Sequence, residues 1–170
     1  MKRSILSINY GVKSLIGAYI LMLIVIFLLP FFSAETYSIV KNTTSQLGAQ
    51  NTPNSWVMNL TFVLLGLGSI MGGWNFLKGY WFHRIVLTVF GISLILTAFY
   101  HHAPINPETN YDKVEDQLHS LFATITGFSF TMFSISTAFI LRNKFERIFA
   151  IGIGVLATFL SLLMFKVVEF

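Results

Sequence analysis

The run LIGAYILMLIVIFLLPFF, residues 15–32, decides the fold because it contains no charged side chain. A helix of about 20 apolar residues crosses the hydrocarbon core of a bilayer. The whole chain of 170 residues is 55% hydrophobic and only 11% charged, whereas soluble domains carry about 25% charged residues. The run also exceeds the apolar region of a signal peptide, about 7–15 residues. We therefore expect a retained first membrane helix that ends near Pro30.

Four more apolar runs follow, which predicts one all-α transmembrane domain over residues 1–170. The expected spans are residues 14–33, 56–77, 84–100, 118–141 and 147–166. In the second span, Gly68 and Gly72 form a small-xxx-small pair, as do Ser69 and Gly73. Small residues at this spacing let helix backbones approach closely. We expect a neighbouring helix to pack against each pair.

The basic residues fall mostly on one side of this arrangement. With the N-terminus inside, the inner face holds Lys2, Arg3, Lys13, Lys78, Arg84, Arg142, Lys144 and Arg147, and the outer face holds only Lys41, Lys113 and Lys166. Inner loops of membrane proteins are enriched in Lys and Arg. The pattern predicts a multi-pass protein of the cell membrane with its N-terminus inside and C-terminus outside. The net charge of +4 follows this topology and does not indicate a nucleic-acid partner.

Ionisable residues gather on the expected outer face in two segments, YHHAP (100–104) and YDKVEDQLH (111–119). The second segment places four of them at helical spacing: Asp112, Glu115, Asp116 and His119. For Asp112 and Glu115 we expect solvated acids, which the helix macrodipole favours in a first turn. Asp116 and His119 lie closer to the apolar run. Ionisable groups at that depth usually face a cavity or a partner, so this pair indicates a functional site.

A metal site is the sharper interpretation of this cluster. His101 and His102 close the third expected helix, and with Asp116 and His119 they offer three or four nitrogen and oxygen ligands. Catalytic zinc uses three such ligands and one open position. Zinc or another divalent metal is the expected cofactor, with Asp116 also a catalytic candidate. The alternative is that these residues bond to each other and to loop carbonyls. The fourth histidine, His83, is expected to be an interfacial residue on the inner face.

The loop between the first two spans carries a family resemblance. The segments YS (37–38), NTTSQLG (42–48) and PNSW (53–56), with Asn59, resemble the bacterial and archaeal membrane family called domain of unknown function 998. In that family a similar Ser-x-Leu-Gly follows the first helix, and an Asp and a His mark the later outer loop, as Asp116 and His119 do here. Members often have six helices, where this chain predicts five.

The resemblance implies that this loop forms a second wall of the site. The ligand-binding candidates it adds are Tyr37, Asn42, Ser45, Asn51 and Asn59. The arrangement is also distantly similar to membrane proteins of the Frag1, DRAM and Sfk1 type, and to the ceramidase and adiponectin-receptor class, in which Ser, Asp and three His surround a zinc. That likeness implies Ser45 as a further catalytic candidate, with His101 or His102, Asp116 and His119 at the metal.

Two functions remain open at this point. The first is a metal-dependent hydrolase or transferase acting on lipid or lipid-linked head groups. The second is a non-catalytic membrane protein that binds a lipid, a peptide or a partner helix, as a subunit, an immunity factor or a homo-oligomer. The chain has no cysteine, which excludes disulfides, thiolate nucleophiles and Cys-ligated metals.

Overall fold

The computed structural model describes residues 10–106 and 108–168, and over these residues the protein is all-α. The long helices are α1 (Tyr10–Leu28), α2 (Ser55–Phe76), α3 (Trp81–Phe99), α4 (Lys113–Thr137) and α5 (Lys144–Val168). Two short 3₁₀ turns, η1 (Leu29–Phe32) and η2 (Thr44–Gly48), lie between α1 and α2. No strand occurs in the described part of the chain.

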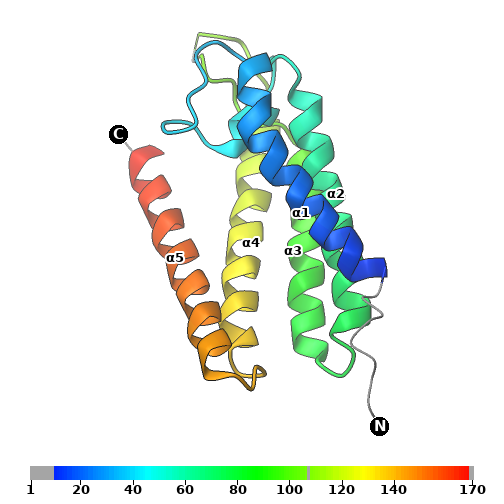
Figure 1. Ribbon diagram of the computed structural model, residues 1–170. Helices are drawn as coiled ribbons and strands as arrows, with labels where there is room; N and C mark the ends of the chain where they lie inside the picture. Colours follow the sequence, from blue (N-terminus) through cyan, green and yellow to red (C-terminus); the bar gives the residue numbers. More distant parts are fainter. Residues whose placement is uncertain (1–9, 107, 169–170) are drawn as a thin grey trace.

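Four segments are long and apolar enough to cross a membrane: Tyr10–Phe32, Ser55–Trp74, Trp81–Phe99 and Lys113–Thr137. This confirms the prediction of a helical membrane protein. Helix α5 is not among the four, so the count of five spans and the orientation stay predictions. Figure 1 shows η2 and the α3–α4 connection at one end, here called the outer end, and the α2–α3 and α4–α5 turns at the other, the inner end.

The helices pack in chain order, each against the next. Figure 1 shows α1 crossing obliquely in front of α2, against which it packs, while α5 diverges from α4 toward its C-terminal end. The expected close approach at Gly68 is confirmed, since a Cβ there would lie 3.1 Å from Leu15 Cα of α1. A Cβ at Gly73 would lie 2.7 Å from Leu87 Cδ2 of α3. Small residues therefore set the spacing of α2 on both sides, as expected for membrane helices.

Several helix boundaries differ from the expected spans. Helix α3 begins at Trp81, before the predicted residue 84, and α4 runs over Lys113–Thr137 where residues 118–141 were expected. The early start of α4 has a local cause. The Asp112 side chain accepts hydrogen bonds from the backbone N–H groups of Val114 (2.8 Å) and Glu115 (3.1 Å). An N-cap of this kind satisfies donors that the first turn would leave unpaired, so the helix extends beyond its apolar part.

The outer loop is anchored in the core by Leu47 of η2. Leu47 and Met58 of α2 are both fully buried, and they belong to the apolar cluster that α1, α2 and α3 share. Asn59 donates a buried hydrogen bond of 3.0 Å to the Gly48 carbonyl, and a Cβ at Gly48 would overlap the Asn59 side chain. A larger residue at position 48 would therefore displace the Asn59 side chain, and the Asn59–Gly48 bond holds η2 against α2.

Candidate functional site

The candidate site forms where the end of α3 meets the start of α4. Helix α3 ends at Phe99, and His101 and His102 follow outside any helix. The chain then returns to Asp112, which caps α4. Because α3 and α4 are packed neighbours, the two histidines lie beside the first turns of α4. The predicted proximity of the two segments is thus observed.

His101 pairs with Glu115. Its Nδ1 forms a short ion-pair contact with Glu115 Oε1, and its backbone N–H donates to the same oxygen at 2.9 Å. The expectation that Glu115 is a solvated acid is therefore wrong: its side chain is 27% exposed and bridges the two segments. Asp112, by contrast, is exposed and caps the helix as expected.

His102 lies against Asp116. Its Nδ1 is 3.0 Å from Asp116 Oδ1, although the approach lacks the direction of a hydrogen bond. The same carboxylate oxygen accepts a 2.7 Å bond from the Ala103 N–H. The two side chains are 29% and 24% exposed. A carboxylate at this distance stabilises any positive charge that the imidazole acquires, so this pair suits proton transfer.

His119 is the most deeply buried member, with 3% of its surface exposed. Its Nδ1 lies 2.7 Å from the Tyr100 carbonyl and 3.0 Å from the Thr97 carbonyl. Both groups can only accept, so Nδ1 carries the hydrogen and, in the neutral ring, Nε2 is the free acceptor. Nε2 is buried and has no hydrogen-bond partner among the residues that the structure describes. The His102 and His119 rings lie 5.0 Å apart.

Gln50 ties the outer loop to this cluster, and sequence reasoning missed it. Its side chain donates to the His101 carbonyl (3.1 Å) and the Asp112 carbonyl (3.0 Å), and it accepts from the Asp112 N–H (2.8 Å). Its backbone N–H donates to the His102 carbonyl at 2.9 Å. These partners are main-chain atoms more than 50 residues away, so no local pattern could have identified Gln50.

The loop residues predicted to bind a ligand are mostly used to fold the loop. Asn42 bonds to Ser38 N–H (2.8 Å) and to Gln46 (3.1 Å), and Asn51 donates to the Asn110 carbonyl (3.2 Å). Asn59 holds Gly48, as described above. Ser45 makes no hydrogen bond or ion pair with the cluster residues that the structure describes. Ligand binding by this set stays a prediction.

Tyr37 differs from the other loop candidates. It packs on the apolar core, and its hydroxyl is buried with no hydrogen-bond partner in the described part of the chain. Burial raises the pKa of the Tyr37 phenol, because the anion would lose its hydration. The hydroxyl is therefore neutral at physiological pH and has an unused hydrogen bond to offer.

The side chains of the cluster are of the types that bind a metal, but too few of them converge on one point to hold it. Metal-binding histidines commonly donate their second N–H to a carbonyl or carboxylate, as His119 does. Within residues 10–106 and 108–168, however, no three His, Asp or Glu side chains converge as metal ligands do. A catalytic zinc needs three. The proposed metal ligands His101, His102, His119 and Asp116 stay a prediction that elemental analysis can test.

His83 is at the inner end, but the prediction of an interfacial side chain is wrong. It is 7% exposed, and the rings of Tyr80, Phe82 and Phe133 meet it edge-on at 5.9, 5.6 and 6.3 Å between centroids. Aromatic packing from α4 thus covers a histidine that the adjacent Arg84 had suggested was at the surface.

Comparison with known proteins gives one family. A family model described as "Protein of unknown function (DUF998)" matches residues 15–169. No curated protein and no solved structure matches the chain. The matched range includes the outer loop, the histidine cluster and all of the helix pairs described above.

Proposed function

The chain belongs to the DUF998 family, and from its outer-end cluster we propose that it is a multi-pass protein of the cell membrane that hydrolyses or transfers a lipid or lipid-linked head group. The family description assigns no activity. The proposal therefore rests on the geometry of His102, Asp116 and His119, and on the membrane-spanning character of the helices that carry them.

The distribution of charge supports an outward-facing cluster. The inner end carries five basic residues of the two turns and the helix starts that flank them: Lys78, Arg84, Arg142, Lys144 and Arg147. Basic residues favour the cytoplasmic side. The cluster at the opposite end then lies at the level of the outer head groups, with the N-terminus inside and five spans.

The observation that carries the proposal is the free Nε2 of His119. A buried nitrogen without a partner is uncommon in native proteins and calls for an explanation. The two carbonyls that hold Nδ1 make Nε2 an acceptor in the neutral ring. An ionisable residue near the membrane with an unused atom is a functional candidate. A hydroxyl or water at this site would supply the missing donor.

The chemistry that these residues can perform is proton transfer. His119 Nε2 accepts a proton from a water or hydroxyl as its oxygen attacks the ester of the head group. The His102 imidazolium, stabilised by Asp116 at 3.0 Å, gives a proton to the leaving oxygen. General acid–base catalysis of this kind typically contributes about 10²–10⁴-fold to a rate. The outer loop held by Gln50 would restrict access of bulk water.

The experiment distinguishes the proposed catalytic role of His119 Nε2 from the structural role of His119 Nδ1. In His119→Asn the side-chain amide can still donate to the Thr97 and Tyr100 carbonyls, but it has no counterpart of Nε2. Ser120→Ala, at the exposed next residue of α4, is the matched control. Purified protein in phospholipid vesicles is incubated, and the lipids are analysed by mass spectrometry for hydrolysed or exchanged head groups.

The expected result is turnover by the wild type and by Ser120→Ala, with a loss of at least about 10²-fold in His119→Asn. Full turnover in a folded His119→Asn protein would overturn the assignment. Metal content is measured on the same samples. A stoichiometric metal lost in His119→Asn would support the metal-dependent form of the activity.

A second candidate is non-catalytic binding of a lipid, peptide or partner helix. One observation favours it: His101–Glu115 and Asp116–Ala103 join the two segments mechanically, as a scaffold requires. Native mass spectrometry of the same vesicle samples distinguishes the candidates. Retention of a lipid that is lost in His119→Asn, without any turnover, would support lipid binding at the cluster and contradict catalysis, whereas the absence of both turnover and His119-dependent retention would contradict catalysis and lipid binding there.

A further inference from the structure

A groove between α4 and α5 lies at the inner end, away from the histidine cluster. Its volume is about 390 Å³, within the range of small-molecule sites. Ser134 of α4 donates a buried 2.7 Å hydrogen bond to the Ala150 carbonyl of α5. A Cβ at Gly154 would lie 2.6 Å from Ile135 Cγ1. The two helices thus touch closely along the floor, and larger side chains form the groove walls.

The walls carry phenylalanine side chains and open toward the surroundings of the bundle. Phe130, Phe133, Phe145 and Phe149 line the groove. Phe145 and Phe149 are 76% and 62% exposed. In a membrane such a groove admits an acyl chain, because its surface is hydrocarbon and its opening faces lipid. Apolar walls alone would accept any chain, so selectivity must come from the polar groups at the mouth.

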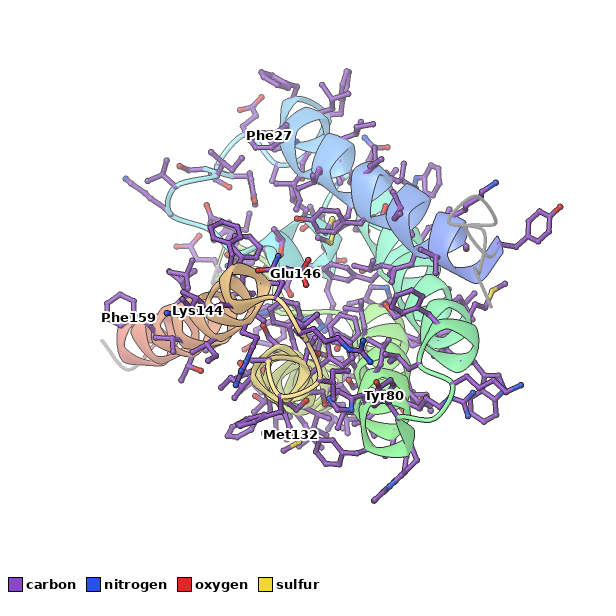
Figure 2. All side chains as sticks on the ribbon, turned by 60° about the horizontal axis from the view of Figure 1, so that its bottom comes forward. Phe27, Tyr80, Met132, Lys144, Glu146 and Phe159 are labelled. Carbon is purple, nitrogen blue, oxygen red and sulfur yellow. The ribbon has the colours of Figure 1, made fainter. Side chains whose placement is uncertain are left out.

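The mouth carries a carboxylate. Glu146, in the first turn of α5, is the one ionisable residue among the described residues that line the groove. Figure 2 shows Glu146 on the side of α5 that faces the other helices, whereas Lys144 and Phe159 lie on its outer flank. Glu146 forms no ion pair with any residue that the structure describes. Its negative charge is therefore available to a ligand.

A cationic residue adjoins the same mouth. Arg142 is exposed and directly follows Leu141, which lines the groove. The lining thus includes an exposed carboxylate, Glu146, and a basic residue lies next to the lining in the chain. Arginine and lysine bind phosphate, and a carboxylate accepts charge-assisted hydrogen bonds from an ammonium. A head group with both a phosphate and a primary ammonium matches both charges.

We propose that this groove binds one molecule of an aminophospholipid, with an acyl chain between the Phe side chains, its phosphate at Arg142, and its ammonium at Glu146. A purely anionic head group would leave Glu146 unpaired beside a phosphate. A choline head group carries positive charge but has no N–H to donate. The site is independent of the histidine cluster, which lies at the opposite end of α4.

The experiment measures lipid selectivity of the full-length protein. It is reconstituted in vesicles of equal parts phosphatidylethanolamine, phosphatidylcholine and phosphatidylglycerol, and retained lipid is identified by native mass spectrometry. The wild type should retain phosphatidylethanolamine about tenfold over phosphatidylcholine, the effect of one charge-assisted hydrogen bond. Glu146→Gln should abolish that preference while acyl-chain binding persists. Glu108→Gln, an exposed acid outside the groove, is the control and should keep the preference.

A second variant tests the groove itself. Ile153→Phe adds a ring to the groove wall and should reduce retention of all three lipids. Equal retention of the three lipids by the wild type would overturn the proposal, as would a preference that survives in Glu146→Gln. A preference for phosphatidylglycerol that depends on Arg142 would also overturn it, in favour of an anionic ligand. None of these outcomes bears on turnover at His119.

Discussion

Replacing Gln50 by Ala tests how the outer loop is held. The change removes three side-chain hydrogen bonds to the main chain of His101 and Asp112. Each such bond contributes about 0.5–1.5 kcal/mol net. The two bonds to Asp112 are exposed, so water can replace them and the lower half of that range applies. With each of the three bonds taken at the lower end of the range, the sum is about 1.5 kcal/mol, which corresponds to about a tenfold increase in opening of the loop.

Amide hydrogen exchange in detergent micelles is the suitable assay, because it reports opening residue by residue. Amides of residues 100–112 should exchange about tenfold faster in Gln50→Ala, while those in the middle of α2 and α3 should be unchanged. Asn51→Ala is the control, since it removes a single exposed bond of 3.2 Å to Asn110 and should change exchange by less than about threefold. Unchanged exchange over residues 100–112 in Gln50→Ala would refute the reasoning, as would a larger effect in Asn51→Ala.

Three further predictions concern stability, each measured by thermal unfolding in micelles. Gly66→Ala should lower the free energy of unfolding by about 1–3 kcal/mol, because its Cβ would lie 2.6 Å from the Gly91 carbonyl oxygen. In the control Gly17→Ala, the added Cβ meets nothing within 4 Å, so that variant should be neutral or stabilising. Equal effects of the two substitutions would contradict the packing argument. Asp112→Ala should cost about 1 kcal/mol through the lost N-cap, and Asp112→Ser should restore most of it if capping is the cause. Tyr37→Phe should stabilise by up to about 1 kcal/mol because the hydroxyl is buried without a partner. The pKa of Tyr37 in the folded protein is raised above 10.0, so with rising pH the tyrosine ionises first in the unfolded chain. Above pH 10.0 the stability of the wild type should therefore fall more steeply than that of Tyr37→Phe. The same pH dependence of stability in both proteins would contradict this assignment.

The site shows where reasoning from the sequence succeeds and where it stops. The closeness of His101 and His102 to Asp116 follows from a short connection between consecutive helices, and short connections join spatial neighbours. Which carboxylate meets which histidine does not follow. Glu115 was expected in solvent because acids in a first turn usually are, yet His101 approaches it from the end of α3. The exposure of His83 was also mispredicted because of a contact between helices. Phe133 of α4 packs against the His83 ring.

Composition and residue order are enough to identify lipid as the surroundings of this protein and to predict its helices. Long uncharged runs require helices in a bilayer, since every backbone polar group must be satisfied within the segment. The residue order also determined the small-residue contacts at Gly68 and Gly73, because a side chain of one hydrogen permits close approach wherever a neighbour lies. Only the tertiary structure decided the role of Gln50, the exposed carboxylate at the α4–α5 groove and the free Nε2 of His119. These features depend on contacts between main-chain atoms and side chains of different helices. Local sequence propensity does not predict contacts between residues far apart in the chain.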